Sequence, residues 1–464
     1  MYGGVHFSPG PDIPNVARID HNCLPMIAAM HRHGIRIDIP FLRSLGTKIQ
    51  SRLTDTEQEI RGAIGNAYQD FNGKSYSPFN PGSPDHVARL LFHELKVQGN
   101  APVPMTKKGK RESTDDETIE MFRSSHPVCG LILDYRGRVK LLGTYVHPIL
   151  ARVTESDPYL HTEFSPTTAA TGRLSSKNPN LQNIPIRTKE GREIRNAFIA
   201  SPGCILVSTD LSQIEMRWAA YRSQDPSMIA VFQSGGDIHI ATACDVFGLD
   251  YNEVMTLQQM VKDGTATPAM IAEWDYFKKF QRLPCKTVGF GVLYGQTPIG
   301  LQASLATEGV NWTEEECTEL IEVKFFGVRP KLREMLDRDH ETVLRYAMIW
   351  DDFGRVRLVP EAKSCHRRIQ QEGIRKAGNH PEQAGAQGTE KLGMAELWPE
   401  MEAINESYTC HPLLQIHDDC LADVDKRIAT EYSLIAKEIF EHASPLRNVP
   451  VLSSVGIAER WGEL

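Results

Sequence analysis

Residues 413–423 read LLQIHDDCLAD, an apolar, alternating stretch whose middle holds a histidine and two adjacent aspartates. Such a pattern predicts two short strands, or one bent strand, packed against a core. Two neighbouring carboxylates repel each other, and placing both near a core costs free energy unless a positive charge neutralises them. A divalent metal ion would supply that charge. The alternative is a hairpin with an acidic tip, because aspartate is a common turn residue. Deciding between the two requires a second acidic site.

Residues 204–222 provide a second acidic site. They read CILVSTDLSQIEMRWAAYR, a hydrophobic strand that ends in Asp210 and runs into an amphipathic helix. A carboxylate at the end of a buried strand is a frequent position for a metal ligand or catalytic acid, because the strand fixes it while the following loop exposes it. Taken alone, the stretch leaves an alternative open, in which Asp210 or Ser212 caps a helix that begins near Gln213.

Residues 281–297, QRLPCKTVGFGVLYGQT, place two cations and two aromatic rings four residues apart. These four residues, called the helix stripe below, are Arg282, Lys286, Phe290 and Tyr294. On a helix this spacing drifts by only about 40° per step, so the side chains share one face. Cations suit phosphates, and ring faces suit a base. An ordinary amphipathic helix with a basic edge is the alternative, but Gly289, Gly291 and Gly295 destabilise a helix and indicate a close approach to its backbone.

Length and composition predict a large globular protein. The chain has 464 residues, of which 41% are hydrophobic and 24% charged, as in proteins of two or three domains. Helical and β-rich segments lie in separate stretches without internal repeats, which predicts an α+β fold. No apolar run is long enough to span a membrane and the N-terminus does not read as a signal peptide, so we expect a soluble, cytoplasmic protein. The nine cysteines form no CxxC pair, which argues against a zinc ribbon or a disulfide framework.

The net charge of −8, from 51 basic and 59 acidic residues, would by itself argue against nucleic-acid binding. A polyanion responds to the local field of its groove, however, and the basic residues are clustered. The two clusters are Lys107, Lys108, Lys110 and Arg111, and then Arg367, Arg368, Arg375 and Lys376. For the first cluster, a solvated run of charge is the alternative interpretation.

The three stretches together resemble the motifs of the family A DNA polymerases, the DNA polymerase I family. Residues 210–217 resemble motif A, the helix stripe falls on motif B, and the HDD of 417–419 resembles motif C. The resemblance includes TAATGRLSSKNPNLQNIPIR at 168–187 and VGIAERWGEL at 455–464, and it covers nearly all of the chain from about residue 16. It implies an α+β right-hand polymerase fold with an antiparallel palm sheet and mostly helical thumb and fingers.

The resemblance also implies a domain order. We expect an N-terminal segment and the start of the palm at 1–41, the thumb at 42–136, the palm at 137–215, the fingers at 216–375, and palm with motif C at 376–464. Family members often carry a proofreading exonuclease ahead of the thumb. Because the resemblance already begins near residue 16, we expect no exonuclease domain in this chain.

By resemblance, the chain is expected to be a template-directed DNA polymerase that uses two Mg²⁺ ions, with Mn²⁺ as a possible substitute. Asp210 and Asp418 would be metal ligands, together with the Leu211 carbonyl, and oxygen ligands suit such a hard ion. In two-metal phosphoryl transfer the ions activate the primer 3′-hydroxyl and neutralise the triphosphate and the leaving pyrophosphate. The family usually has glutamate at the position of Asp419, so the role of Asp419 stays open.

Seven residues match the nucleotide contacts of the family: Gln213, Glu215, His239, Arg282, Lys286, Phe290 and Tyr294. Arg282 and Lys286 would grip the triphosphate, and Lys286 would also act in catalysis by protonating the leaving pyrophosphate. Phe290 would stack on the nucleotide and, as phenylalanine rather than tyrosine, would imply discrimination against dideoxynucleotides. Tyr294 would lie at the insertion site. Glu215 matches the steric gate that crowds a ribose 2′-hydroxyl, although an exposed first-turn glutamate is the alternative.

Contacts to primer-template DNA are implied for a polar set of residues. They are Arg173, Asn180, Gln182, Asn183, Arg187, Arg375, Gln387 and His417, with Lys108, Lys110 and Arg111 at the thumb tip. Polar side chains of this kind contact minor-groove acceptors that all base pairs share, which a polymerase requires. The segment GNHPEQAGAQGT at 378–389 is longer than usual around Gln387, and a core histidine is the alternative for His417. We expect the chain to act on DNA and dNTPs as a monomer.

Three rival functions remain for comparison. A single-subunit RNA polymerase or reverse transcriptase would share the palm, and Glu215 argues against the former while the latter stays open. An accessory nucleic-acid-binding factor would have lost catalysis, whereas Asp210, Asp418 and Lys286 are all present. A two-metal nuclease would leave the helix stripe without a purpose.

Overall fold

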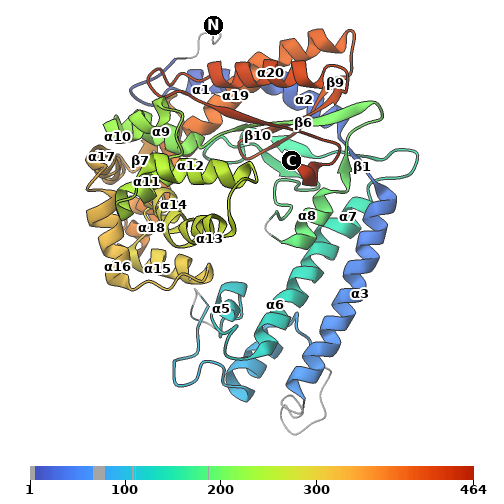
Figure 1. Cartoon of the computed structure of the whole chain (residues 1–464), viewed down its shortest axis with the longest axis vertical. Coiled ribbons are helices and arrows are strands. Elements are labelled where there is room, and N and C mark those ends of the chain that lie inside the picture. The colour runs from blue at the N-terminus through green and yellow to red at the C-terminus, as the bar shows by residue number, and fades with distance from the viewer. Residues whose placement is uncertain (1–5, 66–78, 107–108, 110, 187) are drawn as a thin grey trace. The chain divides into compact units, whose positions relative to one another are not determined.

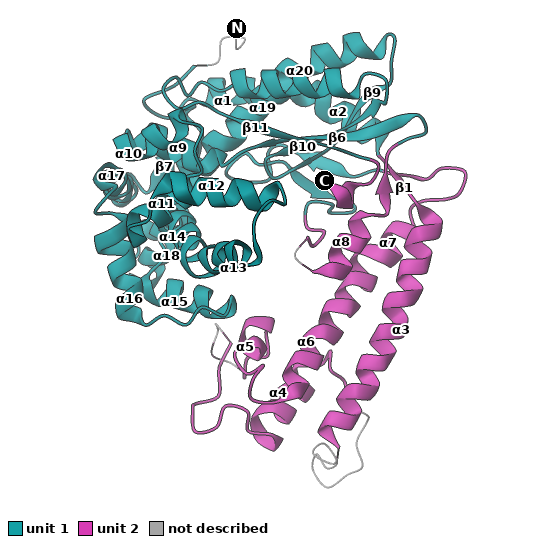
Figure 2. Ribbon diagram, in the orientation of Figure 1, with its two compact units in different colours: residues 1–34, 161–182, 201–458 teal, residues 35–160, 183–200, 459–464 magenta. Residues whose placement is uncertain are grey.

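The computed structural model describes residues 6–65, 79–106, 109, 111–186 and 188–464 (Figure 1). It divides into two compact units, each described by itself (Figure 2). Unit 1 comprises residues 1–34, 161–182 and 201–458, and unit 2 comprises residues 35–160, 183–200 and 459–464. Helices and antiparallel strands occur in both units, which confirms the α+β class. Of the expected DNA contacts, Lys108, Lys110 and Arg187 lie outside the described residues.

A four-stranded antiparallel sheet forms the centre of unit 1, in the order β11-β6-β10-β9. Its strands are β6 (Cys204–Leu211), β9 (Cys410–Ile416), β10 (Asp419–Asp425) and β11 (Ser453–Ala458). Most residues of β6, β9 and β10 are buried, as expected where both faces of a strand are covered. Helices α2 (Leu24–His33), α19 (His380–Asn405) and α20 (Ala429–His442) pack against this sheet (Figure 1).

The rest of unit 1 is mainly helical. Its other α-helices are α1 (Ile13–Asn22), α9 (Ile214–Ser223), α10 (Pro226–Gln233), α11 (Ile238–Phe247), α12 (Tyr251–Lys262), α13 (Pro268–Tyr276), α14 (Leu283–Leu293), α15 (Pro298–Thr307), α16 (Glu314–Thr318), α17 (Pro330–Tyr346) and α18 (Arg367–Gly378). Two small antiparallel pairs complete it, β3 (Glu163–Ser165) with β4 (Ser175–Lys177) and β7 (Met348–Trp350) with β8 (Val356–Leu358).

The stretch 413–423 folds as a hairpin, the first of the two predicted forms. Strands β9 and β10 are joined by the two residues His417 and Asp418, with Ile416 opposite Asp419. Tight two-residue hairpin turns require a residue with positive φ, and His417 has φ 58°. The acids of HDD therefore stand at the tip of a hairpin whose strands are buried.

Two long helices dominate unit 2, α3 (Ile39–Ile64) and α6 (Pro127–Lys140), which lie side by side (Figure 2). An apolar cluster that includes Ile60, Leu91 and Ile132 holds one end of this pair. The other elements are α4 (Pro84–Ala88), α5 (Asp116–Glu120), α7 (His147–Leu150) and α8 (Lys189–Arg195), with a sheet in the order β2 (Tyr159–Leu160), β1 (Ile35–Ile37) and β5 (Phe198–Ile199). The predicted thumb, 42–136, falls within this unit.

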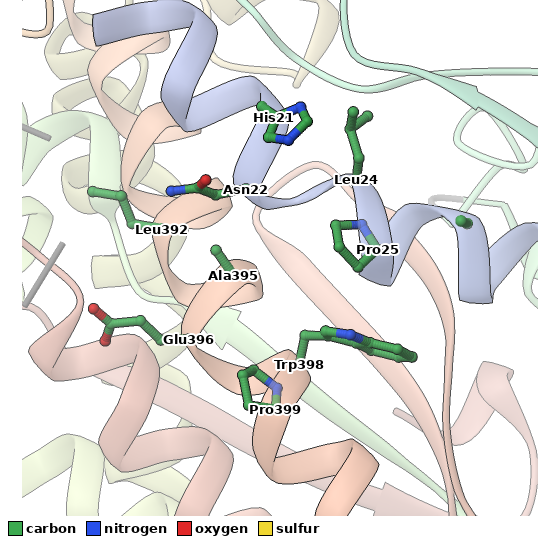
Figure 3. A pocket seen from close by; sticks show the side chains of 10 residues that line it. His21, Asn22, Leu24, Pro25, Leu392, Ala395, Glu396, Trp398 and Pro399 are labelled. Carbon is green, nitrogen blue, oxygen red and sulfur yellow. The ribbon is translucent and has the colours of Figure 1, made fainter. Parts of the chain in front are cut away.

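A cavity of about 660 Å³ lies in unit 1 between the α1–α2 junction and α19. Figure 3 shows Leu24, Pro25 and Trp398 at its wall, together with Leu392 and Pro399. The residues that line it include none of the expected site residues. Across the described ranges, no helix combines the length and the apolar composition needed to cross a bilayer.

Candidate active site

Strand pairing brings Asp210 and Asp418 to the same end of the central sheet. Asp210 is the penultimate residue of β6 and lies opposite Asp419 of β10. The backbone N–H of Leu211 donates a hydrogen bond of 3.0 Å to the carbonyl oxygen of Asp418. Because this register fixes the backbone at both positions, motifs A and C meet although they are far apart in sequence.

The carboxyl groups at this end of the sheet repel one another. Burial raises the pKa of Asp210 to about 7, and the charges of Asp419 and Asp418 add to this effect. Burial also raises the pKa of Asp418, against an opposing contribution from the nearby Arg173. Buried like charges of this kind are stable only when they bind protons or when a cation is present. The site therefore has an excess of negative charge that a bound cation would relieve.

Glu390 of α19 contributes a further buried carboxyl group to the same field. Its side chain is 0% exposed, and among the described residues neither carboxyl oxygen has a partner with good hydrogen-bond geometry, although the Gln415 side chain lies close enough to affect its pKa. Burial raises its pKa well above the usual range, and Asp418, Asp419 and Asp210 reinforce the shift while the Gln415 side chain opposes it. Glu390 was not predicted from the sequence, although a Glu-Lys pair stands inside AQGTEKLGM at 386–394, a stretch with no other charged residue.

The donor set fits a hard divalent ion. Carboxylate oxygens of Asp210 and Asp418 and the carbonyl oxygen of Leu211 are the ligand types that Mg²⁺ accepts. The raised pKa of Glu390 is a second sign that the carboxyl groups here repel one another and lack a cation. Within the part of the chain that the structure describes, however, no three His, Cys, Asp or Glu side chains are arranged as a closed metal-binding group.

Two polar contacts hold the hairpin in place. Asp419 Oδ1 accepts a hydrogen bond of 2.6 Å from the hydroxyl of Ser208 on β6. Gln182 Nε2 donates to the Gln415 carbonyl at 3.1 Å, and Gln182 Oε1 accepts from the Ser176 N–H at 3.1 Å. Gln182, expected to contact DNA, therefore also ties the β4 loop to the hairpin. His417 is exposed at the hairpin tip.

The helix stripe lies on one continuous helical segment, formed by α13, a π-helical turn from Phe277 to Arg282, and α14. Pro284 occupies the first turn of α14, where a missing N–H is tolerated. Arg282 is the last residue of the π-helical turn and has helical backbone angles (φ −70°, ψ −40°), so it lies inside the continuous segment immediately before α14. Tyr294 follows the last residue of α14, so the stripe extends from one end of this helix to the other.

Arg282 is held by the N-terminus of a neighbouring helix. Its Nη2 lies 2.7 Å from Oδ2 of Asp237, whose other carboxylate oxygen caps α11 by accepting from the N–H groups of His239 and Ile240. Lys286 is exposed and makes no ion pair with any described residue. One cation of the stripe is thus already partnered, and the other is available for a ligand.

His239 faces the stripe as an uncharged ring. It is 3% exposed, and its ring centroid lies 5.2 Å from that of Phe290. Burial lowers the pKa of His239 to about 4, assisted by Arg282 and Lys286 and opposed by Asp237. At neutral pH its imidazole can therefore donate or accept a hydrogen bond but adds no positive charge.

Glu215 joins the strand-end acids to the stripe. It is 7% exposed, which excludes the alternative of an exposed first-turn glutamate. Glu215 Oε1 is 2.7 Å from Arg173 Nη2, and Oε2 accepts a 3.1 Å hydrogen bond from the Tyr294 hydroxyl. Burial raises its pKa, and Arg173 acts in the opposite direction. Gln383 Nε2 extends the chain by donating to the Tyr294 oxygen at 2.6 Å.

The start of α9 also excludes the helix-capping alternative for Asp210. The N-cap is Gln213, which has φ 55°, and no side chain caps the helix. A non-glycine residue in the left-handed region is uncommon and strained, and such residues often mark functional sites. Gln213 Oε1 is buried and has no hydrogen-bond partner among the described residues.

The expectation for Gln387 requires correction. Gln387 is 2% exposed within α19, so its side chain does not reach the surface. Gln383, one turn earlier, is only partly buried and contacts Tyr294. Gln383 therefore takes the surface position that the sequence analysis gave to Gln387.

Of the three glycines at 289, 291 and 295, two lie so close to other side chains of the protein that a Cβ atom would not fit without a shift. A Cβ on Gly295, which has φ 65°, would lie 3.0 Å from Cγ of Arg375, an exposed α18 residue expected to contact DNA. A Cβ on Gly291 would collide with Gln296, whereas Gly289 has ordinary space. Of the other expected DNA contacts, Asn180 is exposed in unit 1, and Arg111 and Asn183 are exposed in unit 2.

Comparisons with known proteins identify relatives of this chain. The thermostable DNA polymerase I of Thermus filiformis is 36% identical over 438 residues, which are 94% of this chain and 47% of that protein. DNA polymerase I of Deinococcus radiodurans is 34% identical over 436 residues, 94% of this chain and 41% of that protein. The chain thus spans about half the length of the curated relatives that it matches.

A solved structure of a related polymerase has a similar fold. It is the POL domain of Pol1 from M. smegmatis in complex with DNA primer-template and dNTP, 30% identical, with a TM-score of 0.79 over 97% of this chain and 73% of that one. This likeness confirms the expected polymerase fold. Residues 40–463 match the sequence pattern of DNA polymerase family A, and the chain belongs to that family.

Proposed function

We propose that the chain is a template-directed DNA polymerase that adds dNTPs to the 3′-hydroxyl of a primer. The observation that carries this proposal is the pairing of β6 with β10, which places Asp210 and Asp418 at one end of a buried sheet. The same unit contains the helix stripe, and Glu215 connects the two through its hydrogen bond to Tyr294. Family membership supports the same activity.

Asp210, Asp418 and the Leu211 carbonyl would hold two Mg²⁺ ions. When bound, these ions would activate the primer hydroxyl and stabilise the charge of the triphosphate. The chain's own contribution is to keep these oxygen donors rigid. The register of β6 and β10 sets their backbone positions, and the Ser208–Asp419 hydrogen bond fixes the carboxyl group beside them. Rigid placement avoids reorganisation during the reaction.

The cations of the stripe would bind the triphosphate. Arg282 would exchange part of its contact with Asp237 for a phosphate, and Lys286 would approach the phosphates directly. In the reaction the primer oxygen bonds to the α-phosphorus while the bond to pyrophosphate breaks, and the primer hydroxyl proton passes to solvent. Lys286 would give a proton to the departing pyrophosphate, which lowers the cost of its negative charge.

Sugar selection is assigned to Glu215 and base stacking to Phe290. A buried carboxylate held by Arg173 and Tyr294 cannot easily move aside, so it would crowd a ribose 2′-hydroxyl. Tyr294, bonded to both Glu215 and Gln383, would occupy the insertion site. Selection by shape requires that these groups be held in place, which the hydrogen-bond chain provides.

We further propose that primer-template DNA is bound through Arg173, Asn180, Arg375 and Gln383, with His417 near the primer terminus. Because DNA and dNTPs are found in the bacterial cytoplasm, the protein would act there, as a monomer. Phosphate contacts of this kind weaken as the salt concentration rises.

A primer-extension assay on a primed DNA template with Mg²⁺ tests the proposal. Extension with dNTPs is expected, and Asp210→Asn should abolish it while DNA binding, measured by fluorescence anisotropy, persists. RNA templates and NTPs in parallel reactions separate reverse transcription and RNA synthesis from DNA synthesis. DNA binding without extension in the unaltered chain would favour an accessory factor and overturn the proposal.

A further inference from the structure

Helix α13 and the π-helical turn after it expose more apolar surface than an ordinary surface helix. Ile271 is 43% exposed, Tyr276 57% and Phe280 37%, whereas Trp274 and Phe277 are buried. A helix of a globular protein normally keeps apolar side chains on one face and polar ones on the other. Large exposed apolar patches mark surfaces that bind another molecule.

A groove of about 640 Å³ runs between α12 and this segment, within unit 1. Its apolar wall is formed by Val254, Leu257, Met260, Met270, Tyr276 and Phe277. Of the three exposed side chains named above, only Tyr276 therefore lines the groove. Methionine side chains adapt to the shape of a bound partner, which suits them to a docking surface. Helix α12 has 12 residues and is therefore about 18 Å long, room for roughly three turns of a docked helix.

The rim of the groove carries negative charge. Asp250, Glu253 and Glu273 are among the residues that line it, and no lysine or arginine is among the described lining residues. Lys278, on the same helical segment, pairs with Asp275 at 2.8 Å rather than with a rim acid. An apolar groove with an acidic rim is complementary to an apolar helix face flanked by cations.

We propose that this groove docks an amphipathic helix of a partner protein, whose apolar face fills the groove and whose lysine or arginine side chains meet Asp250, Glu253 and Glu273. The inference does not depend on the proposed catalytic activity, because none of the expected site residues lines the groove. A docked helix would contact Gln281, the neighbour of Arg282, and so would lie on the segment that carries the stripe.

A charge-swap binding experiment on the full chain tests the proposal. The probes are two fluorescein-labelled peptides of about 15 residues, one with leucines on one face and lysines on the other, and one with glutamates in place of the lysines. Fluorescence anisotropy should detect binding of the lysine peptide and not of the glutamate peptide. The double variant E253K/E273K should bind the lysine peptide about tenfold more weakly and gain affinity for the glutamate peptide.

The matched control is E314K/E315K, which reverses two exposed acids on α16 of the same unit. It should bind the lysine peptide like the unaltered chain, and circular dichroism should show that both variants are folded. Equal weakening in both variants would mean general electrostatic attraction and would overturn the proposal. Hydrogen-exchange protection by the peptide outside α12 and α13 would overturn it as well. So would a concentration-dependent dimer that E253K/E273K dissociates, since a second copy of the chain would then occupy the groove.

Discussion

Unit 1 contains two groups of buried acids that are neutralised in different ways. In the first, Asp339, Asp352 and Glu382 surround one cation, Arg222, whose side chain is 10% exposed; Asp339 and Glu382 are buried, and Asp352 is partly exposed. In the second, Asp210 and Asp418 stand at the strand ends without an ion pair to any described lysine or arginine. Arg173, whose charge lowers the pKa of Asp418, is hydrogen-bonded to Glu215 instead. The first group carries its own counterion, whereas the second needs either bound protons or a cation from outside, which is the physical basis for the metal site that we propose there.

Removing one acid of the strand-end group should give the largest effect. We expect Asp418→Asn to slow primer extension roughly a thousandfold or more, because several kcal/mol of transition-state stabilisation are lost. Thermal stability should be unchanged or higher, since a repelling charge is removed. Single-turnover extension and a melting curve measure the two effects. Asp352→Asn in the other group is the control and should retain activity. An active Asp418→Asn would remove the functional difference between the groups.

Removing the internal cation should cost stability instead. Arg222→Met leaves the buried Asp339 and Glu382 and the partly exposed Asp352 without their counterion, and we expect a loss of about 3–5 kcal/mol in the free energy of unfolding, measured with urea. Arg222→Lys keeps the charge but loses the forked geometry, so its loss should be smaller. A loss below about 1 kcal/mol for Arg222→Met would mean that this group is not held by its cation.

The contrast also marks the limit of what the sequence could predict. Strand ends, helix spacing and family motifs identified Asp210, Asp418 and the stripe, because each signal lies within one short segment. Arg222 was not recognisable as buried, since its partners come from α17, the β7–β8 turn and α19. Gln387 was expected to contact DNA, but packing of α19 buries it and leaves Gln383, one turn earlier, at the surface. The burial of Arg222 and that of Gln387 both depend on tertiary contacts, which a local sequence pattern does not reveal.

Both groups of acids should make the stability of the folded chain depend on pH, and only the dependence from the strand-end group should respond to Mg²⁺. The pKa of Asp210 and that of Glu382 are each raised to about 7 in the folded chain, above 3.8 and 4.5 respectively. The unfolded chain releases these protons first as pH rises, so the folded state loses stability between about pH 4 and 7. For one such group the loss between pH 5 and 8 is roughly 2–3 kcal/mol.

Chemical denaturation with a chelator and with excess Mg²⁺ measures this dependence. Mg²⁺ should flatten the part that comes from Asp210 and leave the part that comes from Glu382. The effect of Mg²⁺ should therefore be lost in Asp210→Asn and kept in Glu382→Gln. If the effect of Mg²⁺ persists in Asp210→Asn and is lost in Glu382→Gln, the cation binds at the group of Glu382 and not at the strand ends.

Glu215 lies between the two cases, as a buried acid with one cationic partner and a predicted contact to the incoming sugar. We expect Glu215→Ala to reduce discrimination against NTPs by about 10- to 100-fold in kcat/KM ratios, because the crowding side chain is gone. Glu215→Gln keeps the volume and should retain most of the discrimination. If both variants lose it equally, the charge held by Arg173, rather than the size of the side chain, selects the sugar.

Asp419 should give the smallest effect, although it is adjacent to Asp418. Its Oδ1 accepts a hydrogen bond from Ser208, and an asparagine can accept the same bond through its amide oxygen. We expect Asp419→Asn to change primer extension by less than about threefold, or roughly 0.7 kcal/mol. The same substitution should lower the pKa of Asp210, because Asp419 raises that pKa more than Asp418 does. The pH dependence of stability measured in chelator should therefore become smaller. A thousandfold loss of extension would instead place Asp419 among the ligands, and the strand-end group would then hold its cation with three acids.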